Sequence, residues 1–457
     1  MSPDPPGRVH RFWRRLDGAA DGLAADLGLY AASAVFAAVT AATSTLLPHR
    51  AWGTVATAGY LLATLAVIAQ LIARRRGATR LTGTAARAAL TAVTWVTTAL
   101  VPMVWQCVER AGGRTDRAQE EVVVIEHAGI RLLDHGTPYL GPEAIRALPA
   151  GEQLLGYTPY QPGMALFGLP RAIAGDGWWT DARIWFALVT AIALVVAVTT
   201  LRRTGIGPSR AAADPARPDG PTARDSALVR AVQLATVLPI CALTLATGGD
   251  DLPVLALCLL ALAFGANRRF GAAGVAIGLA GALKLFAWPV ALVLIGYAAT
   301  RGWRTAARLA AGAIGLPVAA LIPVQLVDSS ALVENVLRFP LGHGVVSSPA
   351  QSPFPGYLIA SALPAGRVIA AALLVGAGLL IAVRLVRRPP RTAGSAALIC
   401  GYGLLAAIAL MPSTRFGYLL YPIAFLAWAP ALWLARPESL SAATTGRVAA
   451  TRRTPEA

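Results

Sequence analysis

The chain has 457 residues, of which 56% are hydrophobic, and its mean hydropathy is +0.58. Repeated long apolar runs exclude a soluble domain and predict a membrane protein with many spans. The formal net charge is +17, but the arginines gather at alternate ends of the apolar runs. This is the positive-inside pattern of a membrane protein, so a nucleic-acid partner is not expected.

The first part of the chain is predicted to form a tail and three membrane spans. Residues 1–26 are expected to be a cytoplasmic tail, in which four arginines precede the first apolar run. No small-residue cleavage site ends that run, so we expect an uncleaved helix rather than a signal peptide. The three spans of region 27–106 are predicted at 27–47, 52–73 and 86–106.

Residues 107–182 are predicted to form an extracytoplasmic loop that is rich in acidic side chains. The loop carries ten of the 23 acidic residues of the chain. Residues 118–135 have an apolar stripe at helical spacing, which predicts an amphipathic helix at the membrane surface. Residues 161–173 are apolar but too short to span, so an interfacial or re-entrant segment is expected there.

Region 183–435 is predicted to hold the remaining spans, with a cytoplasmic linker at 202–228 and an outer loop at 327–366. Residues 436–457 are expected to form a cytoplasmic tail. The predicted spans are 183–201, 229–247, 251–267, 270–299, 307–326, 367–386, 394–412 and 416–435.

The run 270–299 decides the topology. Thirty helical residues would measure about 45 Å, more than one span needs. Arg301, Arg304 and Arg308 follow the run and suit the cytoplasmic side, so the run should leave and return as two short helices hinged near Lys284. The sequence thus predicts an all-α, polytopic integral membrane protein of about twelve helical segments, with both termini inside.

Three acids of the loop are candidates for a catalytic base. Glu120, Glu121 and Glu126 follow an outward span, and a carboxylate there could take a proton from an acceptor hydroxyl. The alternative is a solvated helix face.

Asp250 and Asp251 follow two glycines at the predicted outer mouth of a span. One aspartate there would serve as a helix cap, because Asp accepts hydrogen bonds from the first backbone N–H groups. Two in succession also suit sugar hydroxyls or a divalent cation.

Several cations are candidates for binding a phosphate. Lys284 is the only lysine of the chain and lies in an apolar run, where an ionisable group is a functional candidate. Snorkelling to an interface and pairing with a buried carboxylate are its alternatives. Arg338, with His343 nearby, and Arg415 are predicted on the outer side, where the positive-inside bias disfavours arginine. Their alternative is interfacial anchoring.

Other kinds of site are not predicted. The chain has no phosphate-binding Gly-rich loop and no soluble domain large enough for a nucleotide, so an activated group would have to be carried on a lipid. The four cysteines and the histidines show no metal-ligand spacing, so no cofactor is predicted and a divalent metal is not supported.

Several short motifs are spread along the chain. The first three are Gln119-Glu120-Glu121-Val122, Gly136-Thr137-Pro138-Tyr139 and Tyr157-Thr158-Pro159-Tyr160-Gln161-Pro162. The others are Gly249-Asp250-Asp251-Leu252-Pro253, Ala282-Leu283-Lys284, Val333-Glu334-Asn335-Val336-Leu337-Arg338-Phe339-Pro340 and Thr414-Arg415-Phe416-Gly417-Tyr418. The first three resemble the polytopic glycosyltransferases of family 87, which are GT-C-type enzymes, and the others resemble an actinobacterial branch of that family.

The resemblance implies a mannosyltransferase or related hexosyltransferase of the cell envelope, which uses a polyprenyl-phosphate sugar donor and an extracytoplasmic glycan or glycolipid acceptor. It implies that the base is Glu121 or an immediate neighbour. Our hypothesis is an inverting transfer in which Lys284, Arg338 and Arg415 stabilise the departing lipid phosphate. Asp250 and Asp251 would hold the sugar or the acceptor, and Tyr139 and Tyr160 would offer ring surfaces. A transporter or flippase of a lipid-linked substrate and a non-catalytic scaffold are the alternatives. The expected location is the plasma membrane.

Overall fold

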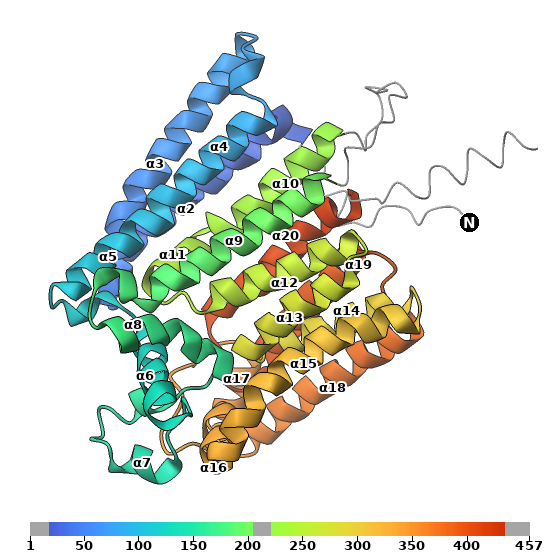
Figure 1. Cartoon of the computed structure of the whole chain (residues 1–457). Coiled ribbons are helices and arrows are strands. Elements are labelled where there is room, and N and C mark those ends of the chain that lie inside the picture. Colours follow the sequence, from blue (N-terminus) through green and yellow to red (C-terminus); the bar gives the residue numbers. More distant parts are fainter. Residues whose placement is uncertain (1–17, 204–220, 435–457) are drawn as a thin grey trace, which may run out of the picture.

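The protein was analysed as a computed structural model, which describes residues 18–203 and 221–434 (Figure 1). These residues are nearly all helical and form no strand, as the sequence predicts. The predicted tails, apart from residues 18–26 of the first, lie outside the described residues, as do positions 204–220 of the predicted linker. Helix α10 begins at Pro221, so the end of that linker segment is helical.

The first three spans are long helices. Helix α2 covers Leu23–Thr43 and α3 covers Leu47–Arg75, while α4 (Thr84–Trp95), a π-helical turn (Val96–Leu100) and α5 (Val101–Ala111) make one continuous helix. Pro102 follows the π-helical turn and has no N–H to donate to the carbonyl of Thr98. The indole N–H of Trp52 donates to that carbonyl at 2.7 Å, so the apolar interior leaves no unpaired acceptor there.

The other apolar helices form the rest of the bundle. A bend of 44° separates α10 from α11, where the sequence predicted one span at 229–247. Pro239 begins α11 and removes a backbone donor, which explains the break. The helices are α9 (Ala182–Arg203), α10 (Pro221–Thr236), α11 (Pro239–Thr247), α12 (Asp251–Ala266), α13 (Phe270–Leu283), α14 (Ala287–Ala299), α15 (Trp303–Val327), α18 (Gly366–Arg387), α19 (Ala393–Leu410) and α20 (Leu420–Leu434).

The predicted break near Lys284 is confirmed. Helix α13 ends at Leu283, Lys284 is extended with φ −154° and ψ 142°, and α14 begins at Ala287. The rings of Phe270 and Tyr297 lie 5.5 Å apart, so the first turn of α13 meets the last turns of α14. The two short helices therefore form a hairpin that turns at Lys284.

The structure contains the segments that the sequence predicts for a polytopic membrane protein. Among the described residues, eight helices are long and apolar enough to span a membrane, and the bent pair of α10 and α11 makes a ninth candidate. Helices α12, α13 and α14 are shorter apolar helices. These add up to the predicted twelve segments.

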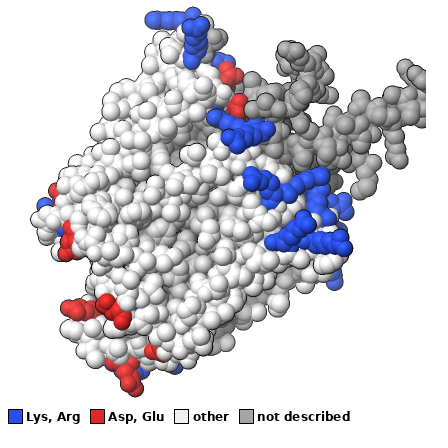
Figure 2. All heavy atoms as spheres, viewed as in Figure 1, with Lys and Arg blue, Asp and Glu red and all other residues white. Residues whose placement is uncertain are grey.

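The connections at one end of the bundle are large and the other end is rich in arginine. The loop 107–182 carries α6 (Glu120–His135), α7 (Pro142–Ala147) and α8 (Leu169–Ala174), and lies near α16 (Ser329–Val333) (Figure 1). Helix α17 (Pro355–Ala362) packs against α18. Figure 2 shows acidic side chains at this end and blue clusters at the opposite end. We call them the acidic end and the arginine end.

Helix α6 lies where the amphipathic helix is predicted, and close backbone contact fixes it. Val122 and Ile125 are fully buried, and Gly129 meets Gly168 of the short 3-10 helix Pro162–Gly168. A Cβ on Gly129 would lie 2.4 Å from the carbonyl carbon of Gly168. We call residues 136–139 and 157–163 the first and second Pro-Tyr turns. The apolar segment after the second Pro-Tyr turn therefore packs directly against α6.

Candidate functional site

Three charged side chains from two helix junctions meet inside the acidic end. Asp250 is the N-cap of α12 and Asp251 is the first residue of that helix, while Lys284 occupies the turn of the α13–α14 hairpin. We call these three residues the Asp–Lys cluster. The Lys284 ammonium donates to Asp250 Oδ2 at 2.7 Å and to Asp251 Oδ1 at 2.6 Å. All three residues are buried, so one ammonium serves two carboxylates in an environment where an unpaired charge would be costly.

Aromatic residues enclose these charges. Tyr421 donates its hydroxyl hydrogen to Asp251 Oδ1 at 2.7 Å. The Lys284 nitrogen lies 5.3 Å from the ring centre of Tyr160 and 5.4 Å from that of Tyr418, within the range of cation–π attraction. Hydroxyls and rings of this kind can hold a polyhydroxylated ring by hydrogen bonding and by stacking.

The second Pro-Tyr turn is attached to the hairpin that carries Lys284. The Gln161 N–H donates to the carbonyl of Leu283 at 3.1 Å, and the Tyr139 hydroxyl donates to the carbonyl of Tyr160 at 2.7 Å. Tyr139 is itself buried, so the structure places it as a support for the Tyr160 backbone. Of the two predicted ring surfaces, Tyr139 and Tyr160, Tyr160 is the one whose ring lies beside Lys284.

Glu121 faces this site from the first turn of α6. Its carboxylate forms an ion pair with the guanidinium of Arg415, which precedes the 3-10 helix Phe416–Leu419. A Cβ on Gly248 would lie 3.9 Å from Glu121 Oε2, so the carboxylate stands beside the turn that leads to Asp250. The side chain of Glu121 is 16% exposed, so this pair is more accessible than the Asp–Lys cluster, whose side chains are 6–9% exposed.

Gln119 attaches the start of α6 to the same turn. Its N–H donates to the carbonyl of Thr247 at 2.9 Å, and its side-chain oxygen accepts from the Thr247 hydroxyl at 3.0 Å. The Gln119 amide nitrogen and His49 Nε2 are 2.8 Å apart. These three contacts of Gln119 therefore fix the start of α6, in which Glu121 is the second residue.

The other two glutamates have different surroundings. Glu120 is exposed to solvent. Glu126 is buried and accepts from both terminal nitrogens of Arg110, at 2.6 and 2.8 Å. Arg110 also donates to Asp181 at 2.8 Å, so these residues join α5, α6 and the start of α9. Glu126 is thus committed to packing contacts, whereas Glu121 faces the site.

Asp181 is a buried carboxylate of the loop that two guanidinium groups hold. Arg183 donates to both of its oxygens at 2.8 Å, and Arg110 adds a third contact. Burial raises the pKa of Asp181, but the two guanidinium charges outweigh burial and hold it well below the ordinary range. The Asp181 carboxylate therefore stays ionised at neutral pH, at the start of α9.

Arg338 and His343 lie on a separate part of the same end. Arg338 is 3.3 Å from Glu334, and its side chain is 61% exposed. His343 is also exposed, and its N–H donates to the carbonyl of Arg338 at 2.8 Å. The structure does not bring these two residues into the Asp–Lys cluster.

The link between the two parts is the second Pro-Tyr turn. The Tyr157 hydroxyl donates to Glu334 at 2.7 Å, and its ring stacks on Phe339 with centroids 4.0 Å apart. The Thr158 N–H donates to the side chain of Asn335 at 2.7 Å. One end of the turn thus contacts the segment of Arg338, and its other end, Tyr160, contacts Lys284.

Three residues of the site were not singled out from the sequence. Tyr418 follows Arg415 by three positions and Gln119 precedes the acid pair, so both lay within motifs of interest. Tyr421 sits in an apolar helix, where its hydroxyl was the only available signal, because a buried tyrosine hydroxyl needs a partner.

The carboxylates do not form a metal-binding group. In the described part of the chain, no three His, Cys, Asp or Glu side chains come together as metal ligands would. Asp250 and Asp251 are instead directed to Lys284 and Tyr421.

Comparison with known protein families identifies the chain at the level of its family. The model of glycosyltransferase family 87 matches residues 157–414, more than half of the sequence. The chain belongs to glycosyltransferase family 87. It is accordingly a membrane glycosyltransferase, which agrees with the resemblance of its motifs. Neither the curated proteins nor the solved structures contain a match.

The matched region of this family 87 protein covers only part of the candidate site. It includes Tyr160, Asp250, Asp251 and Lys284, and it ends one residue before Arg415. Glu121 lies upstream of the match, so its role has to be argued from its position in the structure.

Proposed function

We propose that this family 87 glycosyltransferase transfers a sugar, mannose by the resemblance of its motifs, from a polyprenyl-phosphate donor. The proposed acceptor is a glycan or glycolipid at the outer face of the plasma membrane. In the proposed orientation, the acidic end faces outward and both termini lie on the cytoplasmic side. The observation that carries the proposal is the Glu121–Arg415 pair beside the Asp250–Asp251 turn, at the ends of apolar helices.

In the proposed reaction, Glu121 takes the proton of the acceptor hydroxyl. The hydroxyl oxygen attacks the anomeric carbon of the donor and forms the new glycosidic bond, while the bond from that carbon to the phosphate oxygen breaks. The bonding electrons leave with the polyprenyl phosphate, and Glu121 is left protonated. A carboxylate that is partly exposed at the site can both meet an acceptor and return its proton to water.

Arg415 is the proposed first contact of the phosphate. A guanidinium binds phosphate oxygens through two parallel N–H groups, and such a contact is strong where water is scarce. Arg415 is now bound by Glu121, so an arriving phosphate competes with the carboxylate for the same donors. Donor binding would thereby free Glu121 to act as a base, which couples the two substrates.

The Asp–Lys cluster is proposed to hold the sugar. Lys284 fixes the directions of Asp250 and Asp251, and the rings of Tyr160 and Tyr418 flank the ammonium. Because the Lys284 ammonium already pairs with two carboxylates, we propose that its main role is to orient these carboxylates. Its attraction for the phosphate is proposed to be secondary. Arg338, being exposed, is proposed to contact the phosphate or its lipid from the outer side.

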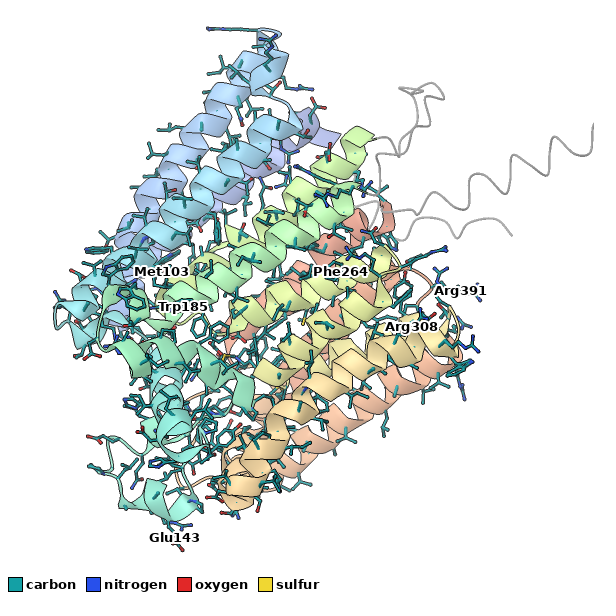
Figure 3. All side chains as sticks on the ribbon, viewed as in Figure 1. Met103, Glu143, Trp185, Phe264, Arg308 and Arg391 are labelled. Atoms are coloured by element: carbon teal, nitrogen blue, oxygen red, sulfur yellow. The ribbon has the colours of Figure 1, made fainter. Side chains whose placement is uncertain are left out.

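The test compares two glutamates of the same loop. Glu121→Gln should lower the rate of sugar transfer from a polyprenyl-phosphate sugar by about 10²–10⁴-fold in membranes that hold equal protein. Glu143→Gln makes the same chemical change at an exposed position of α7, at the edge of the acidic end in Figure 3, and should leave the rate unchanged. A wild-type rate in Glu121→Gln would exclude Glu121 as the base. Glycolipid analysis of a deletion strain would name the sugar and the acceptor.

A further inference from the structure

The arginine end contains a hollow that the transfer reaction does not use. It has a volume of about 470 Å³ and is lined by residues 268–272, Thr305 and Arg308. It lies where the end of α12, the start of α13 and the start of α15 meet. Its volume is in the range of small-ligand sites, roughly 300–1,000 Å³.

Three arginines line this hollow, and no described acidic residue neutralises them. Within residues 18–203 and 221–434, neither Arg268, Arg269 nor Arg308 has a carboxylate within ion-pair distance. At the acidic end the arrangement is the reverse, since Arg110 and Arg415 each bind a carboxylate. The hollow therefore carries concentrated positive charge with donors that remain available.

The backbone adds donors on the same wall. Phe270, Gly271 and Ala272 form the first turn of α13, where helices leave their N–H groups without an intrahelical partner. The side chain of Arg269, at the N-cap position, makes no capping hydrogen bond with this turn. Free N–H groups and the positive end of a helix favour an anion, and here they face a space that arginines also line.

The chain holds Arg268 in a backbone conformation that ordinarily belongs to glycine. Its φ is +57°, which for a residue with a side chain is strained. The N–H groups of Arg268 and Arg269 bond back to the carbonyls of Gly265 and Phe264 at 3.0 and 2.9 Å, as in a helix end that usually closes with glycine. The strained residue is thus an arginine, at a position that lines the hollow.

A general excess of arginine at one end of a membrane protein explains only part of the structure of this hollow. The positive-inside pattern accounts for the sign of the charge and for the end on which it lies. It gives no reason for a concave site, for an uncapped helix start within it, or for a strained arginine on its wall. These features together are those of an anion-binding site.

We propose that the hollow binds a phosphate group, supplied either by the headgroup of an anionic lipid or by a soluble phosphate compound. An arginine guanidinium holds phosphate oxygens through two parallel N–H groups. Basic pockets between membrane helices on the cytoplasmic side, where the arginine end is proposed to lie, bind lipid headgroups. The site is separate from the proposed transfer site, which lies at the opposite end. Figure 3 shows Arg308 at the end that also carries Arg391, away from Glu143.

The experiment measures thermal stabilisation of the purified full chain in neutral detergent. The probes are short-chain phosphatidylglycerol, inorganic phosphate, and short-chain phosphatidylcholine as a zwitterionic control. The test variant is Arg268→Gly with Arg308→Gln, because glycine suits the left-handed backbone and should not lower the melting temperature. The matched control is Arg75→Gln with Arg76→Gln, which removes two exposed arginines from the end of α3 outside the hollow.

We expect phosphatidylglycerol to raise the melting temperature of the wild type and of the control variant. In the test variant, the rise in melting temperature should be at most half as large. A comparable shift with inorganic phosphate would assign the site to a soluble phosphate compound, and a shift with phosphatidylglycerol alone would assign it to a lipid. The proposal is overturned if the test variant keeps the full shift or if the control loses as much. Arg308→Gln alone repeats the comparison if the double variant fails to fold.

Discussion

The guanidinium of Arg415 binds the carboxylate of Glu121, although 294 positions separate the two residues in the sequence. This pair joins the acidic loop that follows the third span to the connection that precedes the last one. It is the one described ion pair of Arg415, and it stands beside the Asp250–Asp251 turn. Loop and bundle therefore meet through groups that can carry the proposed chemistry.

Arg415→Gln should reduce kcat/KM for sugar transfer by about 10²–10³-fold, because it removes the proposed phosphate contact. Arg415→Lys should retain part of the rate, since lysine keeps the charge but not the paired N–H geometry. Initial rates in membranes with equal protein measure both effects.

The pair can also be examined by combining variants. If Glu121 and Arg415 act as a unit, Arg415→Gln in the Glu121→Gln background should cost far less than it costs alone. Arg114→Gln is the control, because Arg114 forms an exposed ion pair with Asp116 on the same loop, and its rate should match the wild type. Fully additive losses would argue against a shared role.

Lys284→Met should destabilise the protein by about 3–5 kcal/mol, because it leaves two buried carboxylates without their cation. Replacing both aspartates as well, in Asp250→Asn with Asp251→Asn and Lys284→Met, should recover much of that stability while transfer stays lost. Denaturant unfolding in mixed micelles measures stability, and the transfer rate measures function. If the triple variant transferred sugar normally, the cluster would serve packing alone.

The sequence predicts the membrane fold well because hydrophobic length and arginine placement are local signals. The break in 270–299 was predictable, since a lone lysine and an excess of length mark the same run. The bend at Pro239 was not predicted, although this proline lies at the middle of the predicted span 229–247 and is its physical cause, because membrane helices often accommodate a proline without ending.

The candidate site was predictable in its residue types but not in its pairings. Glu121 and Glu126 lie five positions apart on one helix, and the sequence offers no reason to separate them. The structure does so through remote partners: Arg415 from the end of the chain reaches the first, and Arg110 from α5 reaches the second. For Lys284, pairing with carboxylates and phosphate binding were both open, and the fold brings Asp250 and Asp251 to it.

Asp181→Asn should lower stability at neutral pH, and the difference from the wild type should shrink in acid. The folded-state pKa of Asp181 is held below its ordinary value, against burial, by Arg183 and Arg110. Its contribution is therefore fully present above the unfolded pKa of about 3.9 and is lost as the pH falls below it toward the folded value. Melting temperatures of both proteins from pH 7 down to the acid limit of folding measure this. A difference that stays constant across that range would contradict it.

Gly163→Ala should separate the second Pro-Tyr turn from the Lys284 hairpin. A Cβ on Gly163 would lie 2.6 Å from the carbonyl oxygen of Ala282, and the obstacle is backbone, which cannot turn away. The contact of Gln161 with Leu283 must then stretch, and Tyr160 should move from Lys284. We expect a loss of stability of about 1–3 kcal/mol and a lower kcat.

The matched control for this change is Gly151→Ala, on the same loop. A Cβ there would meet nothing within 4 Å, so melting temperature and transfer rate should both equal those of the wild type. The comparison separates a general intolerance of the loop from the specific contact at the hairpin. If Gly163→Ala transferred sugar as fast as Gly151→Ala, the contact of the turn with the hairpin would not position the site, and Tyr160 would lose its proposed role beside Lys284.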